Sequence, residues 1–407
     1  MANTASSKAG KPFDVAVLGG GIGGLCLAIG LLKKGVPVTI YEAAPAFSEI
    51  GAGVAFGSNS TKAMGLISEE IKEGHERCAT RNWSEDKLQT WFDYQLGQDA
   101  RGHPAGTHIY ESKSPRGQSS VHRAHFLDEL VKLIPTEIAN FGKRLVNYEE
   151  DTEGVTLKFE DGTTAKHTCL IGCDGIKSIT RQILLGEDNP VSFPHFTGKY
   201  AYRGLIPMDK AAVVIGDRAA RNSQMYLGHG GHVLTFPVTH GSILNVVAFQ
   251  SLDKWEDERW VKPVEKQKMM DEFSTWSETV KSVLNLIEKP ENWALFNHDP
   301  AETYTKGRVC LLGDAAHATT PHQGSGAGMA IEDALILIYD QLRRPRSQKL
   351  VATSIECGHL YELELPGYED DIEKVKENLA YRMKWIWEHD LEADVETAKE
   401  NFKKQTQ

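Results

Sequence analysis

Two glycine-rich segments carry the clearest chemical signal in this 407-residue chain. In the first, Gly19, Gly21 and Gly24 form the pattern G-x-G-x-x-G directly after an apolar run at 15–18. Such glycines permit a tight turn and let the backbone approach a pyrophosphate, and the helix that follows offers free N–H groups to the anion. Glu42, at the end of the next predicted strand, is placed to bind ribose hydroxyls. This segment predicts a dinucleotide site without choosing between NAD and FAD; the alternative is a glycine-rich turn that binds no ligand.

The second segment spans 313–328 and also follows an apolar run. Asp314 comes directly after a predicted strand, where a carboxylate suits the hydroxyls of a ribityl or ribose chain. The glycine-dense stretch at 322–328 offers backbone groups and another helix start to a flat ring or a phosphate. His317 fits a packing role, whereas for His322 packing and a role in the site are both open. Together, the two segments predict one long cofactor that is held from two sides.

The elements around these segments predict an α/β protein. Strand 13–18, helix 23–34 and strand 36–41 form a βαβ unit of the size typical of a dinucleotide-binding half. Between 186 and 295 the pattern changes, and alternating strands separated by glycines predict a mostly antiparallel sheet inserted into the first domain. The strands expected there are 199–206, 223–227, 232–237 and 243–250, followed by a helix at 269–286.

Composition limits the class of protein. The chain is 41% hydrophobic and 25% charged with a net charge of −11, which argues against a nucleic-acid binder because such proteins normally present a basic face. No apolar stretch is long enough for a membrane span, and 1–12 lacks the apolar core of a secretory signal. The six cysteines suggest no disulfide framework, and the isolated pair Cys169 and Cys173 does not indicate a metal site. We therefore expect a cytoplasmic protein without a metal, with neither nucleic acid nor membrane as a partner.

Three motifs resemble those of one flavoprotein family. They are GGGIGG at 19–24, the segment Cys173-Asp174-Gly175-Ile176-Lys177-Ser178 with Arg181, and GDAAHATTPHQGSGAGMAIEDA at 313–334. Over nearly its whole length the sequence is similar to the class A flavoprotein aromatic hydroxylases, which include p-hydroxybenzoate and salicylate hydroxylases. Within that family it most resembles the fungal salicylate hydroxylase-like branch, through the segments 50–54, 202–205, 343–347 and 385–390.

The resemblance implies a fold of the p-hydroxybenzoate hydroxylase type. Its Rossmann-like FAD-binding domain is expected to be discontinuous, at 13–185 and 296–345. An inserted antiparallel-sheet substrate domain is expected at 186–295. A C-terminal helical segment at 346–407 and a flexible N-terminus at 1–12 complete the expected organisation, in a monomer or a homodimer.

The resemblance also implies FAD as the resident cofactor. It places Glu42 on the adenosine ribose, Arg123 near the pyrophosphate and Asp314 on the ribityl chain or the pyrophosphate. Asp174, with the glycine after it, serves both FAD and the reductant in such proteins. Because the chain has no second G-x-G-x-x-G unit, NADH or NADPH is expected to bind only transiently. Three further residues are expected against the flavin or its phosphates: Gly53, Ala327 and Gly328.

The implied activity is that of an FAD-dependent monooxygenase, which hydroxylates a phenolic aromatic acid with NAD(P)H and O₂ through a flavin C4a-hydroperoxide. Salicylate, converted to catechol with decarboxylation, is the expected substrate. Arg203 is expected to bind its carboxylate or phenolate, with a surface ion pair as the alternative. His322 is expected to relay the phenolic proton. An apolar substrate slot, which core packing explains equally well, is expected from Met225, Leu234 and Phe236.

Two alternatives stay open. One keeps the chemistry but changes the substrate to a polyketide-derived phenol, a hydroxynicotinate or another hydroxybenzoate. The other is a non-catalytic FAD-fold binding protein. Some relatives that dearomatise phenols use a tyrosine on the strand that carries Phe236 here, so dearomatisation by that route is not expected. Relatives also carry a longer segment between Glu332 and Arg343, which predicts that a loop is missing near 337–338.

Overall fold

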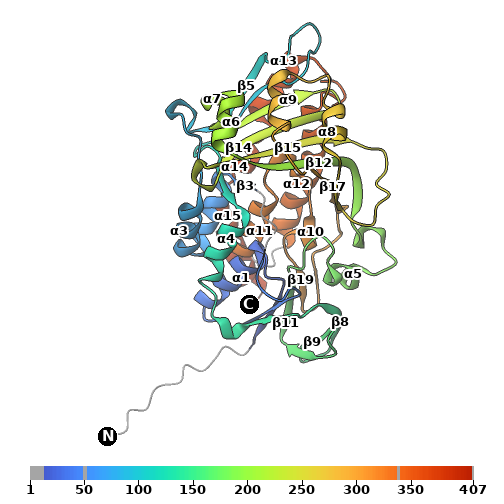
Figure 1. The fold of residues 1–407 in the computed structure, drawn as a ribbon. Helices are drawn as coiled ribbons and strands as arrows, with labels where there is room; N and C mark the ends of the chain where they lie inside the picture. Colours follow the sequence, from blue (N-terminus) through green and yellow to red (C-terminus); the bar gives the residue numbers. More distant parts are fainter. Residues whose placement is uncertain (1–12, 49–52, 337–339, 406–407) are drawn as a thin grey trace.

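The computed structural model describes residues 13–48, 53–336 and 340–405. A parallel sheet lies in the lower half of Figure 1, and a larger, mostly antiparallel sheet lies in the upper half. Two expectations lie outside the described residues, namely the flexible N-terminus at 1–12 and the missing loop near 337–338. Among the helices that are described, none is long and apolar enough to cross a membrane.

The lower sheet has the strand order β18-β19-β11-β1-β2-β7, and every pair of neighbours is parallel except β18 and β19. Its strands are β1 (Val15–Leu18), β2 (Val38–Glu42), β7 (Ala139–Phe141), β11 (Cys169–Gly172), β18 (Thr305–Lys306) and β19 (Val309–Leu311). The register pairs Leu18 with Gly172 and Gly172 with Leu311. Since these three strands end at one level, the loops that follow them emerge side by side at the carboxyl edge of the sheet.

Helices pack closely on this sheet because small residues separate them. α1 (Ile22–Lys33) follows β1 and packs against α11 (Gly326–Leu335), where a Cβ on Gly23 would lie 3.2 Å from the Cβ of Ala330. The other helices of this part are α2 (Ser58–Ile67), α3 (Glu69–Cys78), α4 (Arg123–Val131), α5 (Ile179–Leu185) and α10 (Asp314–His317). Two small sheets complete it, one of β8 (Leu145–Glu150), β9 (Val155–Phe159) and β10 (Thr164–His167), and one of β3 (Gly53–Phe56) and β6 (Ser119–His122).

The upper sheet has the order β16-β17-β12-β15-β14-β13-β4-β5, and only β4 and β13 pair in parallel. Its strands are β4 (Thr90–Leu96), β5 (His108–Lys113), β12 (His195–Pro207), β13 (Gln224–Gly228), β14 (Gly231–Val238), β15 (Ile243–Ser251), β16 (Val261–Pro263) and β17 (Glu291–Asn297). The four strands predicted from alternation are confirmed as β12 to β15. One face packs on the helices α6 (Met208–Ile215), α7 (Asp217–Ala220), α8 (Lys266–Glu272) and α9 (Glu278–Leu284).

Three boundaries differ from those expected. β4 and β5 belong to the upper sheet, although the substrate domain expected at 186–295 does not include them. The sequence did not predict this because the parallel pairing of β4 with β13 joins distant segments and leaves no local pattern. The helix expected at 269–286 is two helices, α8 and α9, since the Ser277 side chain accepts a hydrogen bond from the Val280 N–H and starts a new one. The boundary expected between 345 and 346 falls inside α12 (Asp340–Tyr361).

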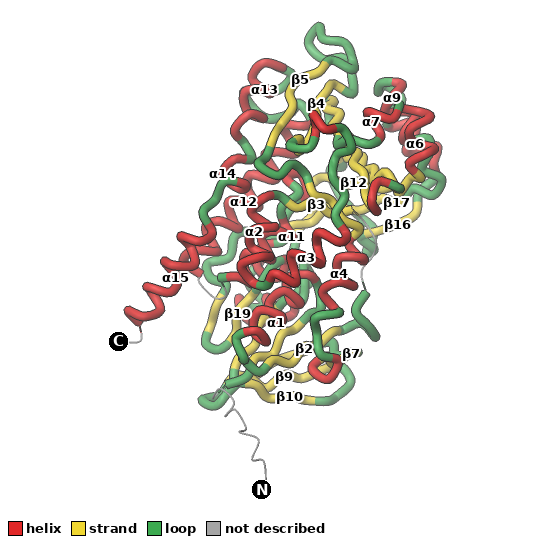
Figure 2. The backbone as a smooth tube through the Cα atoms, turned by 90° about the vertical axis from the view of Figure 1, so that its left-hand side faces the viewer, coloured by secondary structure: helices red, strands yellow, loops and turns green. Residues whose placement is uncertain are grey.

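The C-terminal helices close the other face of the upper sheet. They are α12, α13 (Ile372–Tyr381) and α14 (Lys384–Trp387). The last helix, α15 (Leu391–Gln405), packs against α2 instead, and Figure 2 shows it at the edge of the molecule beyond α14. Leu350, Leu379 and Ile386 from these helices share one apolar core with Leu234 and Phe236 of β14. This face of the sheet is therefore enclosed between the C-terminal helices and the lower part of the molecule.

Candidate active site

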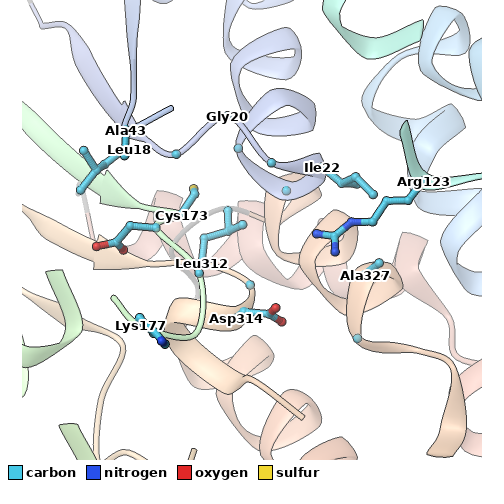
Figure 3. A pocket seen from close by; sticks show the side chains of 18 of the residues that line it. Leu18, Gly20, Ile22, Ala43, Arg123, Cys173, Lys177, Leu312, Asp314 and Ala327 are labelled. Atoms are coloured by element: carbon cyan, nitrogen blue, oxygen red, sulfur yellow. The ribbon is translucent and has the colours of Figure 1, made fainter. Parts of the chain in front are cut away.

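A cavity of about 520 Å³ lies at the edge where β1, β11 and β19 end. Figure 3 shows it between the glycine turn before α1 and the second glycine segment. Both segments contribute to its wall, and so does β12 of the upper sheet. The structure brings most of the predicted cofactor residues together there, namely Gly19, Gly21, Gly24, Glu42, Gly53, Arg123, Asp174, Asp314 and Ala327.

The first glycine segment, 19–24, forms a concave turn, the glycine cradle, in which side chains at Gly19 and Gly24 would clash with the backbone. Gly19 has φ +109°, and a Cβ there would lie 2.3 Å from the carbonyl oxygen of Cys173. A Cβ on Gly24 would lie 2.1 Å from the carbonyl oxygen of Gly19. Gly21 directly precedes α1, a helix of twelve residues, and the first N–H groups of this helix face the cavity. A turn of this shape at a helix N-terminus fits the pyrophosphate of a dinucleotide.

Three charged side chains surround this cradle. Glu42 is fixed by two backbone donors, because its Oε2 accepts from the Gly20 N–H at 2.7 Å and its Oε1 from the Ala44 N–H at 2.8 Å. Each oxygen keeps a lone pair for a ribose hydroxyl. Arg123 begins α4 and points into the cavity, and Asp314 begins α10 as an exposed carboxylate on the facing wall. The Arg123 guanidinium suits the phosphates of FAD, and the carboxylates of Glu42 and Asp314 suit its hydroxyls.

Arg203 of β12 adds a further cation to the wall of the cavity. Its guanidinium lies 4.5 Å from the centre of the Trp293 ring, and its Nε is shielded from solvent without a hydrogen-bond partner among the described residues. Burial, reinforced by the charge of Arg123, lowers the pKa of Arg203 to about 10. Within the described part of the chain no carboxylate pairs with it, so the surface ion pair considered from the sequence is not formed. The site therefore presents an arginine that lacks an anion.

Comparisons with known proteins decide the family. The family model for an FAD binding domain matches residues 12–342. A 6-methylsalicylate 1-monooxygenase (atA) from Aspergillus terreus is 45% identical over 403 residues, which cover 93% of this chain and 90% of that protein. The chain belongs to the salicylate hydroxylase-like class A FAD-dependent monooxygenases. A salicylate hydroxylase from Pseudomonas putida is 40% identical over 421 residues, covering 95% of this chain and 94% of that protein.

A solved structure supports the same assignment for this monooxygenase. A salicylate hydroxylase in its substrate complex superposes with a TM-score of 0.85 at 39% identity, covering 95% of this chain and 98% of the other. The expected fold type, the FAD cofactor and the monooxygenase activity are therefore confirmed. The alternative of a non-catalytic FAD-fold protein is set aside.

One predicted cofactor residue of the monooxygenase lies away from the cavity, and another lines the cavity but also makes hydrogen bonds that stabilise the fold. Gly328 does not line the cavity; it faces α2, where a Cβ would lie 2.1 Å from the Ser60 Oγ, so it serves the packing of α11 on α2. Asp174 lines the cavity, but its carboxylate accepts hydrogen bonds from Ser178 Oγ at 2.6 Å and from the Thr180 N–H at 3.0 Å. Burial raises the pKa of Asp174, although these hydrogen bonds oppose the shift. Its carboxylate thus fixes the start of α5.

Sequence reasoning missed the role of Arg181. This side chain is buried and donates to the carbonyl oxygens of Ala316 at 2.7 Å, Val191 at 2.9 Å and Asp299 at 3.0 Å. It therefore ties the segment after β11 to the second glycine segment. The only signal in the sequence was that Arg181 belongs to the 173–181 motif. Such a motif does not distinguish a residue that contacts a ligand from one that stabilises the fold.

The predicted substrate residues of the monooxygenase share one face of the upper sheet. Arg203 pairs with Val247, Val247 with Leu234, and Leu234 with Met225, so these four side chains form a row across β12, β15, β14 and β13. Leu234 and Met225 are buried in the apolar core of that face and are not part of the cavity wall described above. The row places apolar surface directly beside the unpaired arginine.

Phe236, on the same face, supports the cavity wall from behind. A Cβ on Gly53 would lie 2.8 Å from the Phe236 Cε2, so glycine is needed for the wall to pack on this ring. The Gly53 N–H donates to the Asn245 Oδ1 at 3.2 Å, while the buried Asn245 Nδ2 has no partner among the described residues. Asn245 is thus a further candidate site residue, and nothing in its sequence neighbourhood marks it.

His322, expected to relay the phenolic proton, lies behind the cavity wall and does not line the cavity. It sits in a 3-10 turn at Pro321–Gln323, which directs its imidazole toward the upper sheet. Its ring centre lies 5.0 Å from that of Phe249 and 5.2 Å from that of His232. Burial, reinforced by the neighbouring His232, lowers the pKa of His322 to about 3. The flanking Pro321 and Gly324 do line the cavity, so His322 is one layer from it.

Proposed function

We propose that this monooxygenase hydroxylates a phenolic aromatic acid, with salicylate as the preferred candidate. The observation that carries the proposal is Arg203, a cation at the cavity that has no carboxylate partner among the described residues and stands beside an apolar face. An aromatic carboxylate satisfies both features, because its anion pairs with the guanidinium and its ring packs on apolar surface. The relatives named for salicylate and 6-methylsalicylate support this substrate class.

Arg203 has two tasks in this proposal. It orients the ring through the carboxylate, and its charge lowers the pKa of the phenol on the same ring. A phenolate is more electron-rich than a phenol and therefore reacts better with an electrophilic oxygen. Bound FAD supplies the redox chemistry, since it accepts a hydride from NADH or NADPH and activates O₂.

Other side chains keep the site dry. Leu234, Val247 and Phe236 exclude water from the side of the sheet, which protects a reactive oxygen species from loss. His322 is uncharged near neutral pH because burial lowers its pKa, and its ring lies one layer behind the cavity wall, so the relay of the phenolic proton expected from the sequence stays a prediction.

For salicylate, the overall reaction is balanced with decarboxylation. Salicylate, O₂, NAD(P)H and two protons give catechol, CO₂, NAD(P)⁺ and water. Oxygen is transferred to the carbon that bears the carboxylate, and the bond from that carbon to CO₂ breaks. A cytoplasmic location, a monomeric or homodimeric state and the choice between NADH and NADPH stay predictions.

The test uses the FAD-loaded enzyme with salicylate, 6-methylsalicylate, 4-hydroxybenzoate and benzoate. Salicylate should accelerate NAD(P)H oxidation and yield catechol and CO₂ in equal amounts. If salicylate only accelerates formation of H₂O₂, the substrate assignment is wrong. If another phenol in the panel is hydroxylated and salicylate is not, that phenol replaces salicylate as the proposed substrate.

A further inference from the structure

Asp314, on the wall of the cavity, begins a very short helix that is otherwise buried. This helix, α10, has four residues, and the three that follow Asp314 are each 2% exposed or less, namely Ala315, Ala316 and His317. A single helical turn has little stability of its own, because its first hydrogen bond fixes several dihedral angles at once. The direction of the Asp314 carboxylate therefore depends on the contacts that hold α10 in place.

A buried carboxylate, Asp333 of α11, holds α10 at both ends. Its Oδ2 accepts a hydrogen bond from the Gly313 N–H, just before α10, at 3.1 Å. The same oxygen lies 2.5 Å from Nε2 of His317, the last residue of α10. Burial opposes ionisation of Asp333, but His317 and Arg343 outweigh it and lower the pKa of Asp333. The group is thus a carboxylate, which can only accept, so Nε2 of His317 donates to it.

The hydrogen bond to Gly313 fixes a backbone that is free to move by itself. Gly313 has φ +63°, a value in the left-handed region, and glycine populates many other conformations at no steric cost. The bond to Asp333 selects one of them. The residue that follows, Asp314, is thereby set at a defined angle to the sheet.

A buried cation holds the carbonyl side of the same helix. Arg181 of α5 is 0% exposed, and its Nη1 donates to the carbonyl oxygens of Ala316 at 2.7 Å and of Ala315 at 3.1 Å. Carbonyl groups at the end of a helix lack donors within the helix. The negative Asp333 on the N–H side and the positive Arg181 on the carbonyl side both match the direction of the helix dipole.

The carboxylate of Asp333 is itself fixed from behind. Its Oδ1 accepts from Nε of Arg343 at 2.9 Å, and Nη1 of Arg343 donates to Glu332 at 2.8 Å. Neither Asp333 nor Arg181 lines the cavity, so direct contact with the cofactor does not explain these buried charges. Apolar side chains would fill the same space without the cost of removing charges from water, but they cannot orient N–H and C=O groups.

We propose that Asp333 and Arg181 are positioning residues of the cofactor site, which together set the direction of the Asp314 carboxylate toward FAD. The inference rests on the FAD cofactor of this family and on the predicted contact of Asp314 with FAD. It does not depend on the choice of substrate. Since both residues act through Asp314, the loss of either should weaken the binding of FAD.

The experiment measures the Kd of FAD by diluting the holoenzyme and recording the fluorescence of the FAD that is released. Asp333→Asn replaces one accepting oxygen by a donor, and we expect the Kd of FAD to rise about tenfold or more. Asp93→Asn is the matched control, because Asp93 is a carboxylate of similar exposure that pairs with Lys87 and does not line the cavity. The control should keep the Kd of wild type. An unchanged Kd in Asp333→Asn would overturn the proposal.

A double-mutant cycle separates positioning from general loosening of the fold. Asp314→Ala should raise the Kd of FAD, and adding Asp333→Asn to it should raise the Kd by less than about twofold more, because Asp333 acts through Asp314. Arg181→Lys should raise the Kd in the same way, and its effect should also vanish in Asp314→Ala. If the effects of the single variants multiply, Asp333 and Arg181 act independently of Asp314 and the proposal is wrong. An unchanged Kd in Asp314→Ala contradicts it as well.

His317 provides a second test if Asp333→Asn does not fold. His317→Leu removes one donor to Asp333 but leaves the pair with Arg343, and should raise the Kd of FAD about threefold or more. His317→Gln offers a donor again and should recover most of the affinity. Equal Kd values in these two variants would speak against positioning. No substrate is present in these measurements, so their failure is distinct from a failure of salicylate to yield catechol.

Discussion

The guanidinium of Arg203 lies 4.5 Å from the centre of the Trp293 ring, and no described carboxylate pairs with it. The face of an aromatic ring attracts a cation but does not satisfy its N–H groups. The Nε of Arg203 accordingly has no acceptor within the described residues. The wall of the cavity therefore holds both an arginine ready for an anion and a cradle for phosphates.

Arg203→Gln should weaken the binding of an aromatic acid while FAD stays bound. A hydrogen bond to a charged group is worth about 1.5–3 kcal/mol, which corresponds to roughly a 10- to 150-fold rise in the Kd of salicylate. Titration of the flavin absorbance with salicylate measures it. Arg218→Gln, at an exposed arginine paired with Asp86, is the matched control and should leave this Kd unchanged. An unchanged Kd in Arg203→Gln would remove Arg203 from the substrate site.

Gly24→Ala should abolish retention of FAD. The added Cβ would lie 2.1 Å from the carbonyl oxygen of Gly19, so the turn would have to open. Gly30→Ala in the same helix is the control, since its Cβ would meet only the Cγ2 of Ile67 at 3.1 Å. The control should retain FAD, because Ile67 only has to shift by a few tenths of an ångström and lies outside the turn that holds the pyrophosphate. The ratio of FAD to purified protein decides; equal ratios in the two variants would contradict the cradle.

Sequence reasoning succeeded where the backbone or the local pattern restricts the residue type. Gly19 and Gly24 are required by contacts that any side chain would block, so their pattern predicts the cradle directly. Alternation likewise predicts that Leu234 and Phe236 share a face with each other, because strand periodicity is local.

Sequence reasoning failed where the role depends on a distant neighbour. Gly328 looked like a cofactor residue, but Ser60 of α2 decides its role. Asp174 does line the cavity as expected, but its bonds from Ser178 and Thr180, which fix the start of α5, could not be read from the motif. His322 stands in a glycine-rich cofactor segment, yet its ring packs on β14 and β15, and no local pattern reports which sheet a turn will meet.

Glu332→Gln should strongly destabilise the fold. Glu332 is fully buried, and its Oε2 accepts from Arg343 and from Arg346, each at 2.8 Å. Removing its charge leaves two buried arginines with too little counter-charge, which typically costs about 3–5 kcal/mol in the free energy of unfolding. Urea denaturation measures this loss. Glu392→Gln breaks an exposed ion pair with Lys62 and should cost less than about 1 kcal/mol, so equal losses would contradict the difference between buried and exposed pairs.

The free energy of unfolding should fall as the pH drops from about 6.5 to about 4. Burial lowers the pKa of His75 from 6.5 to about 4, and that of His298 likewise. Between these values the unfolded chain binds protons that the folded protein excludes, so acid favours unfolding by about 3 kcal/mol for each residue. Stability from this source is complete above pH 6.5 and is lost once the pH reaches about 4. His75→Gln keeps a partner for the Ser119 hydroxyl and should remove the part of the slope that His75 causes, leaving that of His298. Denaturant titrations at several pH values measure the free energy of unfolding for wild type and His75→Gln. If this free energy falls equally with pH in both proteins, the folded protein does not hinder protonation of His75.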